Sequence, residues 1–131
     1  YKKYKVTTVG LEDLIRKSDI VTLHLPLDKS TQYILDSDNL SFLKNDAVLI
    51  NLARGGLIDE VALKELLNNN KIAGAALDVF EIEPPVDPSF ATMDNVLITP
   101  HIGGSTEEAI LAMGMAAIEG LENSKDPLNF L

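Results

Sequence analysis

The chain has 131 residues, of which 46% are hydrophobic and 24% charged, a balance typical of a globular domain that buries its own core. Its formal charge of −9 disfavours nucleic acid and anionic membrane surfaces as partners. The absence of cysteine excludes disulfides and thiolate chemistry, and the apolar runs are all shorter than the ~20 residues of a membrane span, so we expect a soluble, cytoplasmic protein.

Helix and strand patterns alternate along the first half of the chain. Apolar residues with helical spacing predict a helix over 11–15, and the β-branched run at 20–25 predicts a buried strand. Ser37 is expected to cap a short helix through Leu43. The apolar run at 47–52 predicts the next buried strand.

The second half repeats this alternation. Asp59 is the expected N-cap of a helix over 61–67, whose leucines share one face. Residues 73–79 are expected to form an apolar strand rich in small side chains, and 95–99 a last strand. Acidic residues then open a final helix over 107–121.

Strands that alternate with helices and are almost continuously apolar indicate a parallel sheet with helices on both faces. We therefore predict an incomplete doubly wound α/β domain, similar to a Rossmann fold. Polar segments follow the apolar strands at 51–56, 78–85 and 100–106. Ligands of such sheets bind beyond the carboxyl ends of the strands, so these segments are expected to form one site.

Four segments, in order along the chain, resemble the D-isomer-specific 2-hydroxyacid dehydrogenases, and most closely the D-3-phosphoglycerate dehydrogenase branch. They are residues 19–26, 51–59, 74–84 and 100–106. The resemblance implies hydride transfer between a nicotinamide cofactor and a small D-2-hydroxy or 2-oxo acid. It also implies a homodimer and NAD as cofactor, with NADP left open. Were 3-phosphoglycerate the substrate, the reaction would belong to serine biosynthesis.

The resemblance places the family's three catalytic roles on Arg54, Glu83 and His101. A histidine titrates close to neutral pH and can exchange a proton with a carbonyl oxygen, while a carboxylate on its other ring nitrogen orients it. An arginine fork suits a substrate carboxylate, and Gly55 and Gly56 would let the backbone pass close to a ligand. Each role has a structural alternative: a packing or capping histidine, a solvated loop glutamate and an arginine in an ion pair.

Cofactor contacts are implied at the ends of the same segments. Asp78 would lie near the nicotinamide ring or, alternatively, only cap its loop, and His24 is expected to be structural. The two histidines are 77 positions apart and no cysteine is available, so we expect no metal site. The residues implied to bind the cofactor are Leu25, Pro26, Ala53, Arg54, Asp78, His101, Gly103 and Gly104.

The glycine pattern that binds a dinucleotide pyrophosphate, G-x-G-x-x-G, does not occur in the chain. We therefore expect residues 1–120 to be a partial NAD(P)-binding domain that lacks its first βαβ unit. Residues 121–131 would be a tail leading to a mostly absent substrate domain. Such a fragment is expected to have little or no turnover alone. The alternatives are a non-catalytic module that senses NAD(H) or drives oligomerisation, and a structural remnant that binds no cofactor.

Overall fold

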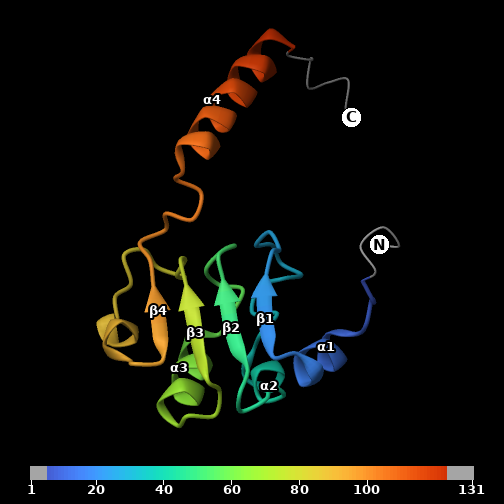
Figure 1. The fold of residues 1–131 in the computed structure, drawn as a ribbon, viewed down its shortest axis with the longest axis vertical. Helices are drawn as coiled ribbons and strands as arrows, with labels where there is room; N and C mark the ends of the chain where they lie inside the picture. The colour runs from blue at the N-terminus through green and yellow to red at the C-terminus, as the bar shows by residue number, and fades with distance from the viewer. Residues whose placement is uncertain (1–5, 124–131) are drawn as a thin grey trace. The chain divides into compact units, whose positions relative to one another are not determined.

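The computed structural model describes residues 6–123 and contains a four-stranded parallel sheet (Figure 1). Its strands pair in the order β1-β2-β3-β4. The predicted parallel α/β class, similar to a Rossmann fold, is confirmed. The strands are β1 (Ile20–Leu23), β2 (Val48–Asn51), β3 (Gly74–Leu77) and β4 (Val96–Ile98).

Three helices connect and cover these strands: α1 (Leu11–Lys17), α2 (Ser37–Leu40) and α3 (Glu60–Asn68). The cap of α3 is Asp59, as predicted, because its carboxylate accepts hydrogen bonds from the backbone N–H groups of Val61 and Ala62, both at 3.0 Å, although the helix begins one residue earlier than expected. These bonds satisfy two of the donors that the first turn of a helix leaves unpaired.

Two predictions of local structure were wrong. The cap of α2 is Asp36 and not Ser37, because the Asp36 carboxylate accepts the Asn39 N–H at 2.8 Å, and the helix ends at Leu40 instead of Leu43. A short 3₁₀ helix, η2 (Pro88–Thr92), was not predicted. Asp87 caps it by accepting the Ser89 N–H at 2.9 Å. The strands are also shorter than their apolar runs, since pairing stops where the polar segments begin.

The two faces of the sheet differ in burial. On one face the strand residues are buried and join a core with apolar side chains of α1, α2 and α3. The opposite face carries one row of residues that are in register across all four strands. Leu97 in this row is 65% exposed, and Ile20, which lies beside the row on β1, is 61% exposed. The row consists of Thr22, Ile50, Ala76 and Leu97.

Contacts divide the chain into two units, one through His101 and one from Ile102. The second unit contains α4 (Glu107–Glu122), close to the predicted bounds, and Thr106 caps it by accepting the Ala109 N–H at 3.2 Å. Among residues 6–123, no helix has the length and hydropathy needed to cross a bilayer. Part of the predicted tail at 121–131 lies outside the described residues, from 124 onward.

Candidate active site

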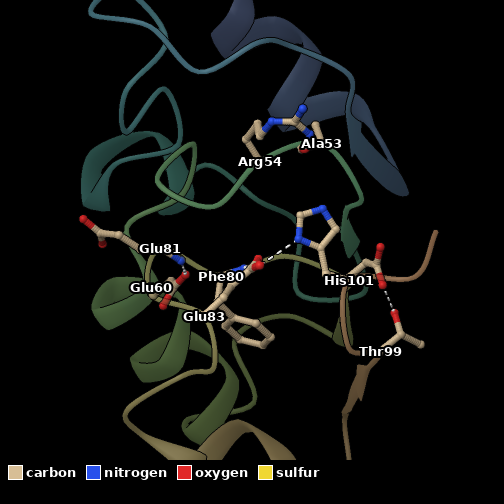
Figure 2. A network of polar contacts seen from close by, with 9 residues as sticks. Ala53, Arg54, Glu60, Phe80, Glu81, Glu83, Thr99 and His101 are labelled. Atoms are coloured by element: carbon tan, nitrogen blue, oxygen red, sulfur yellow. Dashed lines mark hydrogen bonds and ion pairs between the residues drawn. The ribbon is translucent and has the colours of Figure 1, made fainter. Parts of the chain in front are cut away.

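A carboxylate and an imidazole meet at the carboxyl ends of β3 and β4. The Glu83 Oε2 atom lies 2.7 Å from His101 Nδ1, and the other Glu83 oxygen accepts the Phe80 N–H at 3.0 Å (Figure 2). These two hydrogen bonds, the one with His101 first, hold the pKa of Glu83 below its usual value. The His101 side chain remains 51% exposed. The pair can therefore hold a proton and present it to a molecule in the adjoining cleft.

The backbone of His101 has an uncommon conformation for a side chain other than glycine, with φ at 54°. It follows Pro100, where the chain leaves β4. A left-handed residue of this kind has a free-energy cost and is found disproportionately at functional sites. Here the conformation accompanies a ring whose Nδ1 atom faces Glu83.

The segment that carries Arg54 is held by the buried side chain of Asn51, at the end of β2. Asn51 Oδ1 accepts the Ala53 N–H at 3.1 Å, and its Nδ2 donates to the Arg54 carbonyl at 2.9 Å. The Arg54 side chain is exposed and turns toward Ala53, whose carbonyl oxygen accepts its Nη1–H at 2.6 Å (Figure 2). The guanidinium thus stands in a fixed loop with donors facing solvent.

The residues expected to contact a cofactor line two clefts at this end of the sheet. One, of about 480 Å³, lies after β1 and β2 and is lined by Leu25, Pro26, Ala53 and Arg54 together with His24, Leu27 and Leu52. The other, of about 590 Å³, lies after β3 and β4, where Asp78, Glu83 and His101 occur among apolar walls. Gly103 and Gly104 lie in the turn before α4, in the second unit.

The apolar walls and polar groups of the second cleft suit a flat heteroaromatic ring that carries an amide. Its walls are mainly apolar, from Phe80, Pro84, Pro85 and Ile98, and Asp78 and Thr99 supply polar groups. Asp78 is only 2% exposed, and its carboxylate accepts the Thr99 hydroxyl. These residues fit the nicotinamide end of a dinucleotide. Within residues 6–123, no group of three His, Cys, Asp or Glu side chains is placed to hold a metal ion.

Sequence reasoning missed three contributors to this site. Asn51 was visible as a polar residue at the end of an apolar strand, but its two hydrogen bonds to the Arg54 loop were not predicted. Thr99 was treated only as part of a strand. Glu60 lies outside the predicted helix over 61–67, but it is the first residue of α3 and its carboxylate accepts the Glu81 N–H. His24 lines the first cleft, with Nε2 3.0 Å from the Thr22 hydroxyl, and its structural role stays a prediction.

Comparison with known proteins gives one family match, over residues 1–103, to "D-isomer specific 2-hydroxyacid dehydrogenase, NAD binding domain". Among curated proteins, the chain is 47% identical over 112 residues to D-3-phosphoglycerate dehydrogenase of Methanocaldococcus jannaschii. That match covers 86% of this chain and 21% of the relative. The chain spans between 21% and 38% of the length of the first three curated relatives.

Solved structures give the same relationship. A D-lactate dehydrogenase from Sporolactobacillus sp. superposes with a TM-score of 0.86 at 38% identity, covering 95% of this chain and 43% of that one. An acyclic imino acid reductase in complex with NADPH and D-Arg gives a TM-score of 0.82 at 38% identity, covering 91% and 40%. These relatives differ in substrate while sharing the fold.

Proposed function

The chain belongs to the D-isomer specific 2-hydroxyacid dehydrogenase family, and we propose that it holds the acid–base pair and the nicotinamide end of the site of an oxidoreductase acting on 2-oxo and D-2-hydroxy acids. The observation that carries the proposal is the 2.7 Å contact between Glu83 and His101 beside the apolar cleft. A bound NAD or NADP would supply or accept the hydride. The chemistry left to the chain is to bind the acid and move one proton.

In the proposed reduction, protonated His101 donates the proton of its Nε2 atom to the oxygen of the 2-oxo group as hydride reaches the carbon. The ring is left neutral, with its Nδ1–H donated to Glu83. In the reverse direction, neutral His101 takes the hydroxyl proton while hydride leaves. Glu83 fixes the ring orientation and stabilises its charged form, as carboxylates do in comparable histidine sites.

Arg54 is the proposed carboxylate-binding residue. Its planar fork can form two parallel hydrogen bonds with the acid, which orients the neighbouring carbonyl. We propose that Leu25, Pro26 and Ala53 line the cofactor groove beside it, that Asp78 lies near the nicotinamide carboxamide, and that Gly103 and Gly104 contact the cofactor.

Since the chain contains no G-x-G-x-x-G pattern, we propose that residues 1–120 form a partial NAD(P)-binding domain and 121–131 a tail toward a substrate domain. The substrate, 3-phosphoglycerate or another small acid, is proposed from the family alone.

The first test is titration of the 131-residue chain with NADH and with NADPH by calorimetry. We expect measurable but weak binding and slow oxidation of NADH with a panel of 2-oxo acids at high protein concentration. His101→Ala should lower that rate by about 10²–10⁴-fold, the usual contribution of a positioned acid or base. Glu65→Ala, at an exposed site on α3 outside both clefts, is the control and should leave the rate unchanged. A folded chain that binds neither nucleotide, or a rate that survives His101→Ala, would contradict the proposal.

A second candidate function is a non-catalytic module that assembles in response to NAD(H). The exposed apolar side chains on one sheet face, Ile20 and Leu97, favour it. Such a module would change its sedimentation on adding NADH while oxidising none of the cofactor with any 2-oxo acid. Cofactor oxidation that depends on His101 would exclude this alternative.

A further inference from the structure

The peptide that joins Phe80 to Glu81 contacts two residues that follow β2, Gly55 and Glu60. The first contact is close: a Cβ atom on Gly55 would stand 2.0 Å from the Phe80 carbonyl carbon and oxygen and 2.4 Å from the Glu81 nitrogen. No side chain fits in that space. The close approach at Gly55 is thus to the protein's own backbone and not to a ligand, in contrast to the sequence-based prediction.

The second contact is with Glu60, the first residue of α3. Its Oε1 atom accepts the Glu81 N–H at 2.6 Å (Figure 2). Burial raises the pKa of Glu60, the hydrogen bond from Glu81 lowers it, and the nearby Glu81 and Glu83 charges raise it further. A partly desolvated carboxylate beside two others is an unfavourable arrangement unless a specific hydrogen bond requires an acceptor at that place.

The side chain of Glu81 adds a third connection. Its Oε1 atom accepts the Tyr33 hydroxyl at 2.6 Å, and the Tyr33 N–H in turn donates to the Gly56 carbonyl at 2.8 Å. The segments around Tyr33, Gly55 and Glu60 therefore converge on one short stretch of chain. That stretch also contains the Phe80 N–H, which binds the Glu83 carboxylate.

We propose that Glu60 is a positioning residue for the Glu83–His101 pair. By accepting the Glu81 N–H, it fixes the turn over 80–83, and this turn sets one Glu83 oxygen on the Phe80 N–H and the other on His101 Nδ1. Because Gly55 follows Arg54 and packs on the same peptide, the turn also sets the spacing between Arg54 and the pair. The consequence for hydride transfer rests on the function proposed above, whereas the coupling between Glu60 and His101 can be measured without it.

The test is NMR of the 131-residue chain, observing the Glu81 amide and the His101 Nδ1-bound proton. Glu60→Ala should speed hydrogen exchange of the Glu81 amide by roughly fivefold or more, as expected for a lost hydrogen bond. It should also move the His101 proton upfield and broaden it. Glu60→Gln should restore much of both signals, because its amide oxygen can accept the same N–H. Glu65→Ala, an equal charge change at an exposed site on α3, is the matched control and should alter neither signal.

A Glu60→Ala variant with an unchanged His101 signal would overturn the inference, as would a Glu65→Ala variant with the same effect. If Glu60→Ala does not fold, the wild-type chain decides. Its Glu81 amide shift should follow the Glu60 carboxyl titration, with a midpoint above 4.5, and an amide that ignores this titration overturns the inference. Loss of NADH binding or oxidation in the wild type, with the coupling intact, would contradict the proposed function alone.

Discussion

At the scale of single residues, Glu83 is distinguished by having both carboxylate oxygens engaged while its side chain is still 38% exposed. Glu81, two positions earlier, also has a partner, but that partner is Tyr33. The two glutamates therefore differ in what they can influence. Glu83 acts on the His101 imidazole, and Glu81 acts on the Tyr33 phenol, whose pKa it raises.

The lowered pKa of Glu83 gives a pH prediction with a definite sign. A carboxyl whose pKa is lower in the folded than in the unfolded state stabilises the fold above its ordinary value of 4.5, and that stabilisation is lost as the pH falls through the lowered value. We expect the Glu83 carboxyl carbon to titrate below 4.5 by NMR, and to move back toward 4.5 in His101→Ala. An unchanged midpoint in that variant would show that His101 is not the main cause.

Asn51 allows a second prediction at this scale, because its buried amide is bonded on both sides. Asn51→Ala leaves the Ala53 N–H and the Arg54 carbonyl without their partner, so we expect a loss of about 1–3 kcal/mol in the free energy of unfolding. Asn51→Asp keeps the acceptor but sets a buried carboxylate oxygen against the Arg54 carbonyl, so we expect a loss at least as large. Urea unfolding measures both, with Asn68→Ala as an exposed control expected to change stability by less than about 0.5 kcal/mol. Equal effects at positions 51 and 68 would contradict this account.

At the scale of elements, the start of α2 shows which of two adjacent residues with similar capping preference is the N-cap. Asp36 has extended backbone and accepts the Asn39 N–H, whereas Ser37 is already the first helical residue. We expect Asp36→Ala to cost about 1 kcal/mol of stability and Ser37→Ala to cost only a few tenths. Thermal unfolding followed by circular dichroism compares the two directly. A larger loss for Ser37→Ala would return the cap to the position that the sequence pattern favoured.

The α2 cap is one of the features that the sequence alone could not predict, whereas other features of the fold could be predicted. The parallel sheet, the Asp59 cap of α3 and the location of polar segments at strand ends could be predicted, because each depends on local periodicity or on a single capping residue. The choice between Asp36 and Ser37 could not, since both are good caps and only the backbone conformation decides. Pairings such as Glu60 with Glu81, 21 positions apart, depend on how packed segments approach one another, and no local pattern encodes that.

At the scale of the whole molecule, net charge and exposed apolar surface act in opposite directions. The formal charge of −9 makes copies of the chain repel one another at low ionic strength. The sheet face that carries Ile20 and Leu97 favours their association, because apolar side chains there are open to water. Salt shortens the range of the repulsion to about 8 Å at 0.15 M and leaves the apolar attraction in place.

We therefore propose that the chain self-associates through this face, and expect its average sedimentation coefficient to rise with protein concentration, more steeply in 0.15 M salt than in 0.01 M. Leu97→Thr combined with Ile20→Thr should weaken association, because threonine has a β-branched shape suited to a strand and a smaller apolar area than leucine or isoleucine. Val61→Thr removes a similar apolar side chain from α3, where Val61 is 71% exposed, and serves as the control. Equal weakening by the control would place the contact elsewhere, and a monomer at every concentration and salt would show that charge repulsion prevails over the exposed face.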